Sequence, residues 1–151
     1  MPLCTFCGHS TVPEEIRPKL SAEIRQHITE LGVTEFWVGN YGGFDRMAKA
    51  EVRKLKAEFP QIRLCLLVPY LPGDRTKLDL EGVDEVLFPA ELETVPKRLA
   101  IPRLNRYMVQ KADYLIAYVN HVSGGAYKTM ELAWSKAKDG KLRIVRILAE
   151  K

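Results

Sequence analysis

Short apolar segments alternate along this chain with longer segments in which apolar residues recur every three or four positions. The first kind predicts strands at residues 3–7, 35–38, 62–68, 84–88, 113–119 and 142–148. The second predicts helices at about residues 18–31, 44–59, 101–111 and 125–138. Strands that alternate with helices of this length are joined by right-handed crossovers. The pattern therefore predicts an α/β, Rossmann-like three-layer domain with a mainly parallel sheet.

Length and composition are those of one soluble domain. The 151 residues suffice for a single core covered on both faces of a sheet, so we expect one domain over residues 1–151. No apolar run approaches the roughly 18 to 20 residues that a membrane span requires, and the N-terminus has no secretory pattern. We therefore expect a cytoplasmic protein with no membrane partner.

Cysteine spacing invites a metal interpretation near the N-terminus. Cys4 and Cys7 have a known ligand spacing, but on a strand they project to opposite faces, and no second cysteine pair accompanies them. Three cysteines in all fit a reducing compartment and core packing better than a disulfide framework. We expect neither a metal nor a cofactor.

Two glycine turns each join a predicted strand to a predicted helix. Ser123-Gly124-Gly125 follows strand 113–119, and Gly39-Asn40-Tyr41-Gly42-Gly43 follows strand 35–38. The first N–H groups of a helix have no internal partner, and glycine lets a ligand approach the backbone closely, so both turns predict phosphate sites. Gly8-His9 leaves the first strand in the same way. Because carboxyl ends of parallel strands meet at one edge, these turns should line one crevice.

Side chains around the turns complete the predicted site. Ser123, Lys128 or Thr129 would assist the backbone at the phosphate, Tyr41 or Tyr127 would face a base, and Asp45 or Asn40 would contact a ribose. Asp45 could equally serve only to stabilise its helix start, and His9 could be a loop histidine that caps backbone. The expected ligand-binding residues are Gly8, His9, Gly39, Asn40, Tyr41, Gly42, Gly43, Asp45, Pro69, Ser123, Gly124, Gly125, Tyr127, Lys128 and Thr129.

Gly8-His9, the Gly-x-x-Gly-Gly turn at 39–43 and the segment 103–133 together resemble the SLOG superfamily. The resemblance spans residues 3–138 and is strongest in the final third. The chain is similar in particular to small single-domain SLOG proteins of bacteria and phages. It implies a Rossmann-like fold that binds nucleotides or nucleotide-derived ligands. Those proteins open with a Thr-Gly-His-Arg-like turn, whereas this chain has Cys7-Gly8-His9-Ser10, so Arg17 or Arg46 would have to replace the missing arginine.

The enzymes of that superfamily, the LOG-type phosphoribohydrolases, carry the motif Pro-Gly-Gly-x-Gly-Thr-x-x-Glu. Gly124, Gly125 and Glu131 match it, while the chain departs from it at Ser123, Tyr127 and Lys128. As an enzyme, the protein would be a nucleoside 5′-monophosphate N-glycosidase, with Glu131 stabilising the cationic sugar and Arg106 or Arg103 orienting the substrate. The alternative for Glu131 is an ordinary ion pair with Lys128.

The net charge of +4 comes from 23 basic and 19 acidic residues, which are interleaved and form no basic tail. This mixing disfavours nucleic acid as a partner. We therefore expect binding of a nucleotide or nucleotide-derived small molecule, as a sensor, a sequestering protein or an enzyme. The alternatives are the N-glycosidase and, further, a single-strand DNA-binding module, since SLOG includes a DNA-processing branch. We also expect a homo-oligomer, a dimer or larger, because the apolar stripe of residues 44–59 is broad.

Overall fold

Six parallel strands and four α-helices form the part of the chain that the computed structural model describes, residues 2–70, 78–122 and 124–148. The strands are β1 (Leu3–Gly8), β2 (Glu35–Val38), β3 (Arg63–Leu67), β4 (Glu85–Leu87), β5 (Tyr114–Tyr118) and β6 (Arg143–Arg146). The helices are α1 (Arg17–Thr29), α2 (Gly43–Glu58), α3 (Lys97–Lys111) and α4 (Gly125–Lys138), with 3-10 turns at Glu14–Ile16 and Ala90–Leu92. The predicted Rossmann-like α/β fold is confirmed.

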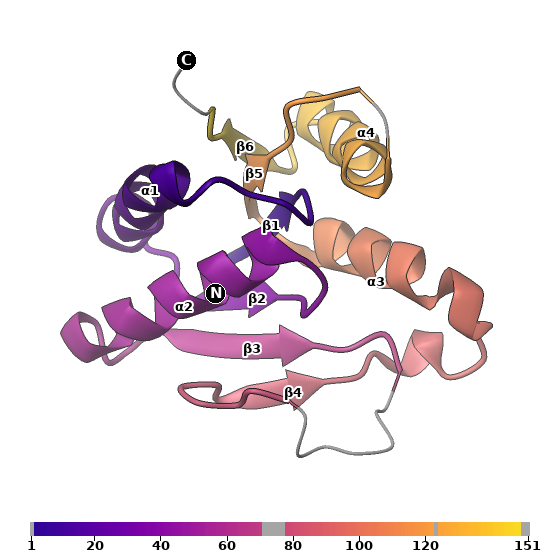
Figure 1. Ribbon diagram of the computed structural model, residues 1–151, viewed down its shortest axis with the longest axis horizontal. Coiled ribbons are helices and arrows are strands. Elements are labelled where there is room, and N and C mark those ends of the chain that lie inside the picture. The colour runs from indigo at the N-terminus through magenta and orange to yellow at the C-terminus, as the bar shows by residue number, and fades with distance from the viewer. Residues whose placement is uncertain (1, 71–77, 123, 149–151) are drawn as a thin grey trace.

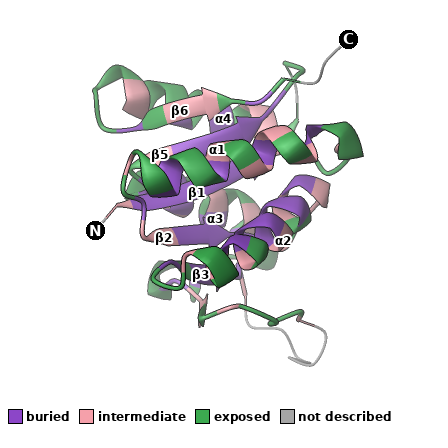
Figure 2. Cartoon of the chain, turned by 90° about the vertical axis from the view of Figure 1, so that its left-hand side faces the viewer, coloured by how far each residue is buried: buried purple, intermediate pink, exposed green. Residues whose placement is uncertain are grey.

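The helices cover the sheet on both faces, α1 and α2 on one side and α3 and α4 on the other (Figure 1). Strand alternation explains why the central strands read as continuous apolar runs. In β3, Leu64 and Leu66 pack in the core beneath α1 and α2, while Cys65 and Leu67 pack in the core beneath α3 and α4. Figure 2 shows the buried strands behind helices whose outer sides are exposed. This double burial produces the three layers.

Cys4 and Cys7 lie in different cores, as the strand alternation predicted. Cys4 belongs to the core beneath α1 and α2, Cys7 to the core beneath α3 and α4, and both thiols are free. Among the described residues, no three His, Cys, Asp or Glu side chains gather closely enough to hold a metal ion. None of the helices in the same described ranges is both long and apolar enough to cross a membrane.

The strand order β4-β3-β2-β1-β5-β6 places a topological switch between β1 and β5. The chain builds outward from β1 to β4 and then returns through α3 to add β5 and β6 on the other side. In the register of this pair, Cys7 lies opposite Ala117 and Gly8 opposite Tyr118, so both strands end together. In open α/β sheets the ligand crevice forms at such a reversal, outside the carboxyl ends of the strands.

One helix boundary differs from its prediction. The sequence predicts a helix from about residue 101, because proline suits a first helical turn, yet α3 begins at Lys97 and carries Pro102 inside it. Pro96 precedes the helix and supplies the break instead. Pro102 lies in the second turn, where its missing N–H costs one bond to the carbonyl of Arg98. The longer helix extends over the carboxyl edge of the sheet.

Candidate functional site

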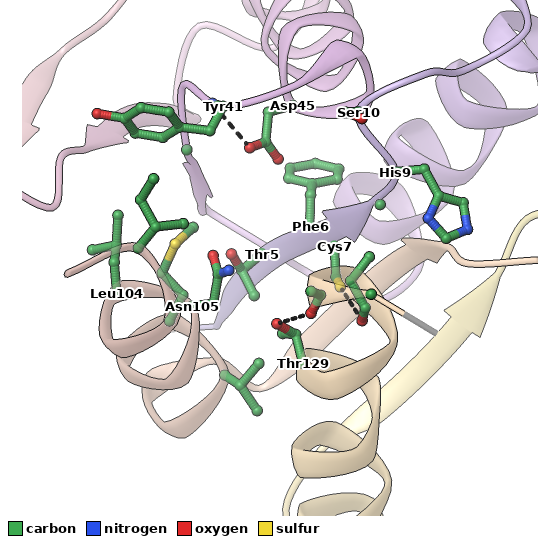
Figure 3. Close-up of a pocket in the computed structure, with 18 of the residues that line it drawn as sticks. Thr5, Phe6, Cys7, His9, Ser10, Tyr41, Asp45, Leu104, Asn105 and Thr129 are labelled. Carbon is green, nitrogen blue, oxygen red and sulfur yellow. Dashed lines mark hydrogen bonds between the residues drawn. The ribbon is translucent and has the colours of Figure 1, made fainter. Parts of the chain in front are cut away.

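A cavity of about 550 Å³ lies at the carboxyl ends of β1 and β5 (Figure 3). Its floor is the end of β1 and the loop after it, and one wall is the inner side of α3. The turn after β2 and the turn between β5 and α4 form the remaining sides. The cavity therefore occupies the predicted crevice at the topological switch.

The wall from α3 is mostly apolar. Leu104 and Met108 are buried there, and Asn105 adds one amide that can both donate and accept hydrogen bonds. On the floor, the Thr5 hydroxyl donates to the carbonyl of Trp37 at 3.0 Å, and the Cys7 thiol donates to the carbonyl of Ala126 at 3.5 Å. Burial raises the pKa of Cys7 to about 12, so this thiol packs rather than reacts.

The glycine turn after β2 is closed against the loop after β1. The N–H of Gly43 donates to the carbonyl of Ser10 at 2.7 Å, and the N–H of Phe44 donates to the carbonyl of His9 at 3.3 Å. A Cβ at Gly43 would lie 2.7 Å from the Ser10 oxygen, and one at Gly42, where φ is 117°, would lie 3.0 Å from the Ser10 Cα. These glycines allow two backbone segments to touch, so the first N–H groups of α2 are already used.

The glycine turn before α4 is open. Gly124 has a φ of 90°, and a Cβ added at Gly124 or Gly125 would meet no atom of the described residues within 4 Å, its chain neighbours and own helix aside. The helix starts at Gly125, and its first backbone bond within the described residues runs from the N–H of Lys128 to the carbonyl of Gly124 at 3.1 Å. The preceding N–H groups have no intrahelical acceptor. Gly124, Gly125 and Ala126 line the cavity, so the amino end of α4 borders it.

Among the described residues that line the cavity, Asp45 is the one with an acidic side chain. It accepts a long bond from the N–H of Tyr41 at 3.4 Å, and a Cβ at Gly39 would lie 2.9 Å from its Oδ2. Burial raises the pKa of Asp45 to about 7, so near neutral pH the carboxyl exchanges between acid and carboxylate. Figure 3 places Asp45 and Tyr41 on one side of the cavity, across from Asn105 and Thr129.

His9 ties the loop after β1 to the loop after β5. Its Nε2 accepts the N–H of Asn120 at 2.9 Å, and its ring stacks on His121 with centroids 3.8 Å apart. Burial and the neighbouring His121 lower the pKa of His9. Because Nε2 must keep a lone pair for the amide, the neutral ring carries its proton on Nδ1. His9 is then an uncharged hydrogen-bond donor at the cavity.

Eight of the residues predicted to bind ligand line this cavity: Gly8, His9, Gly39, Tyr41, Asp45, Gly124, Gly125 and Thr129. The hydroxyl of Thr129, however, donates to the carbonyl of Gly125 at 3.1 Å, so its hydrogen is not available to a phosphate. The cavity lining does not include Asn40, Gly42, Gly43, Pro69, Tyr127 and Lys128. Ser123 lies outside the described residues.

The two candidate catalytic residues are not brought to the cavity. Glu131 is exposed on α4, and Arg106 is exposed on α3, where it lines a different hollow. The expected ligand-binding residues did not include Asn105, Asn120 and His121, which all line the cavity. The last two directly follow a predicted strand, so the rule that selected Gly8 and His9 selects them too. Asn105 and Arg106 both precede strand 113–119, so the sequence alone leaves open which of them reaches over the site. Tertiary packing brings Asn105 to the cavity and Arg106 to the other hollow.

Charge is distributed unevenly between the two parts of the chain. Between Lys97 and Arg146 there are eleven basic and three acidic residues, whereas residues 1–96 contain eleven basic and fifteen acidic ones. Helix α3 has five basic residues and no acidic residue. The expected even interleaving is therefore wrong for α3, α4 and β6.

No family model and no curated protein matches this chain. A solved structure of DNA processing protein A from Helicobacter pylori is similar to it, with a TM-score of 0.66 and 14% sequence identity. The similarity covers 99% of this chain, which spans 66% of that protein's chain. At this identity the likeness shows a shared Rossmann-like fold.

The expectation that nucleic acid is disfavoured as a partner is contradicted. The similar protein was described for its single-stranded DNA binding mode. The expectation rested on an even mixture of charges. Such an average conceals the basic segment of residues 97–146.

Proposed function

We propose that this protein binds single-stranded nucleic acid and holds one of its nucleotides in the cavity between β1, β5 and α3. The observation that carries the proposal is the open turn at Gly124–Gly125, which borders that cavity beside a helix with five basic and no acidic residues. Membership of the SLOG superfamily, as one domain over residues 1–151, is part of the same proposal, since the fold and the glycine turns fit it.

The amino end of α4 is the proposed phosphate site. Its first N–H groups have no intrahelical acceptor, and the positive end of the helix dipole lies behind them. Gly124 and Gly125 have no side chain to keep a phosphate away from these groups, and no packed neighbour among the described residues lies within 4 Å of the positions that a Cβ would take.

The rest of the cavity suits a nucleoside. Its volume of about 550 Å³ lies within the range of roughly 300 to 1,000 Å³ typical of small-molecule sites. Leu104 and Met108 offer an apolar surface to the face of a base, and Asn105 can hydrogen-bond its edge. Tyr41, with 41% of its surface exposed, can stack on an adjacent base of the strand.

A matched pair of substitutions at Gly125 tests the phosphate site. Gly125→Pro removes the N–H while keeping a residue that suits the first helical position, and Gly125→Ala keeps the N–H and adds a methyl group in open space. Losing a hydrogen bond to a charged group costs about 1.5 to 3 kcal/mol, so Gly125→Pro should weaken binding of a labelled single-stranded oligonucleotide roughly tenfold or more. Fluorescence anisotropy measures this. Equal affinities of the two variants, or equal binding of duplex and single strand, would overturn the proposal.

A second candidate is binding of a free nucleotide or nucleotide-derived molecule, as a sensor or sequestering protein. The observation that favours it is the size of the cavity, which fits one small molecule. Calorimetry with nucleoside monophosphates, ADP-ribose and cyclic nucleotides distinguishes the two. Binding of these compounds with no gain for an oligonucleotide supports the second candidate. The expected homo-oligomer stays a prediction, which native mass spectrometry would check.

A further inference from the structure

We infer that a second hollow, between α3 and residues 91–95, binds a backbone phosphate of the same nucleic-acid strand. This inference rests on the proposed function and adds a second point of contact. The hollow has a volume of about 200 Å³ and is lined chiefly by Arg103, Arg106, Tyr107 and Gln110, with Glu91 from the segment before the helix. It is separate from the cavity at the strand ends.

The two arginines have no carboxylate partner among the described residues. Arg17 and Arg63 illustrate the opposite case in this protein: Arg17 contacts Glu51 at 2.7 Å and Arg63 contacts Glu85 at 2.9 Å. No such ion pair in the described ranges involves Arg103 or Arg106, although Glu91 lies at the same hollow. A guanidinium presents a planar fork of donors that matches a phosphate, and two beside one hollow can neutralise one or two strand charges.

The hollow is built on a rigid support. The ring of Tyr107 stacks on Trp37 with centroids 5.7 Å apart and planes 4° from parallel. The Trp37 Nε1–H in turn donates to Glu35 at 2.9 Å. At the end of the helix, the Lys136 ammonium donates to the carbonyls of Val109, Gln110 and Ala112 at 2.9, 2.8 and 2.5 Å. A binding site on a fixed helix loses little side-chain and backbone freedom when a ligand arrives.

Helix α3 separates the two binding positions. Leu104, Asn105 and Met108 point to the first cavity, whereas Arg103, Arg106 and Gln110 line the second hollow, so both lie on adjacent stripes of one helix. A helix with its side chains is about 10 to 12 Å across, and one strand of B-form DNA carries one charge per roughly 3.4 Å of axis. A single strand stacked at that spacing must therefore span on the order of three or four nucleotides to fill both positions.

The dependence of affinity on strand length tests the inference. We expect dTMP to bind the wild-type protein and the double variant Arg103→Gln/Arg106→Gln equally. A single-stranded oligothymidine of roughly eight nucleotides, long enough to cover both positions, should bind the wild-type protein at least tenfold more tightly than the double variant. The slope of log affinity against log salt should fall by about 0.7, the change expected for one lost phosphate contact of a single strand. Lys138→Gln/Lys141→Gln, which removes two exposed cations at the far end of α4, is the matched control and should leave the octamer affinity within twofold.

The outcomes separate this inference from the proposed function. If the octamer binds but the arginine variant changes neither its affinity nor its salt slope, the second phosphate site is wrong while the first stands. If neither dTMP nor the octamer binds folded protein, the proposed function itself fails. If polyglutamate binds the wild-type protein more tightly than the octamer and loses that affinity in the arginine variant, the hollow takes acidic peptides and the nucleic-acid assignment is overturned.

Discussion

The two glycine turns of this protein have similar sequences but different surroundings in the structure. Both follow a strand, contain paired glycines and begin a helix. Gly42 and Gly43 lie against the backbone of Ser10, which accepts the N–H of Gly43 at 2.7 Å. Gly124 and Gly125 face open space beside the cavity. A glycine pair at a helix start can therefore serve either contact between backbones or access for a ligand.

The difference assigns the turns complementary roles. The closed turn holds the loop after β1 in place and positions Asp45 and Tyr41 at the cavity. The open turn leaves the amino end of α4 accessible. A site made from one rigid and one accessible turn keeps its shape without a ligand and still offers free backbone donors.

The largest expected contrast is in stability when each turn receives a methyl group. Gly43→Ala forces a Cβ to 2.7 Å from the Ser10 oxygen and 3.1 Å from Val12 Cγ1, so we expect a loss of about 1 to 3 kcal/mol of unfolding free energy. Gly125→Ala should change it by no more than about 0.5 kcal/mol, or raise it, since the methyl group meets nothing and alanine favours helix. Urea unfolding measures both. Similar midpoints for the two variants would break the comparison.

Asp45 provides the next contrast, through pH. Burial raises its pKa to about 7, so the folded state holds this proton more tightly than the unfolded state does. The stability from this group is complete at acidic pH and is lost as the pH rises toward 7. Asp45→Asn mimics the neutral form, so its gain over the wild type should grow by roughly 1 to 3 kcal/mol between about pH 5 and pH 8. Urea unfolding at both pH values measures this difference in unfolding free energy. A difference that does not change with pH would show that the Asp45 carboxyl is solvated in the folded protein.

The smallest expected effect is that of substituting Glu131. This substitution tests whether the open turn serves for binding alone. The Glu131 side chain is exposed on α4 and does not line the cavity. Glu131→Gln should therefore alter oligonucleotide affinity by less than about twofold, as an exposed residue away from the ligand does. Anisotropy measures the affinity, and an assay for released base on nucleoside monophosphates measures turnover. A base-releasing activity that this substitution abolishes would return Glu131 to a catalytic role.

Much of the fold could be predicted because its information is local. The apolar run at 62–68 and the stripe that begins at Phe44 identify β3 and α2 from periodicity, since a strand buried on both faces is apolar throughout and a surface helix only on one side. The start of α3 was predicted four residues late, because Pro102 suits a first helical turn better than a second. The sequence also contains the basic character of residues 97–146, but an average over the whole chain does not reveal it.

The candidate site, too, was predictable from the sequence only in part. By itself, the sequence determined the strand-and-helix alternation, and with it the edge where Gly8, Gly39 and Gly124 come together, since parallel strands joined by right-handed crossovers end at one side. Only the tertiary structure decided which glycine turn is closed, that Asn105 reaches the cavity and that Glu131 does not. Those outcomes depend on which backbone or helix lies opposite a residue in space, and contacts between segments tens of residues apart leave no periodic trace in the sequence.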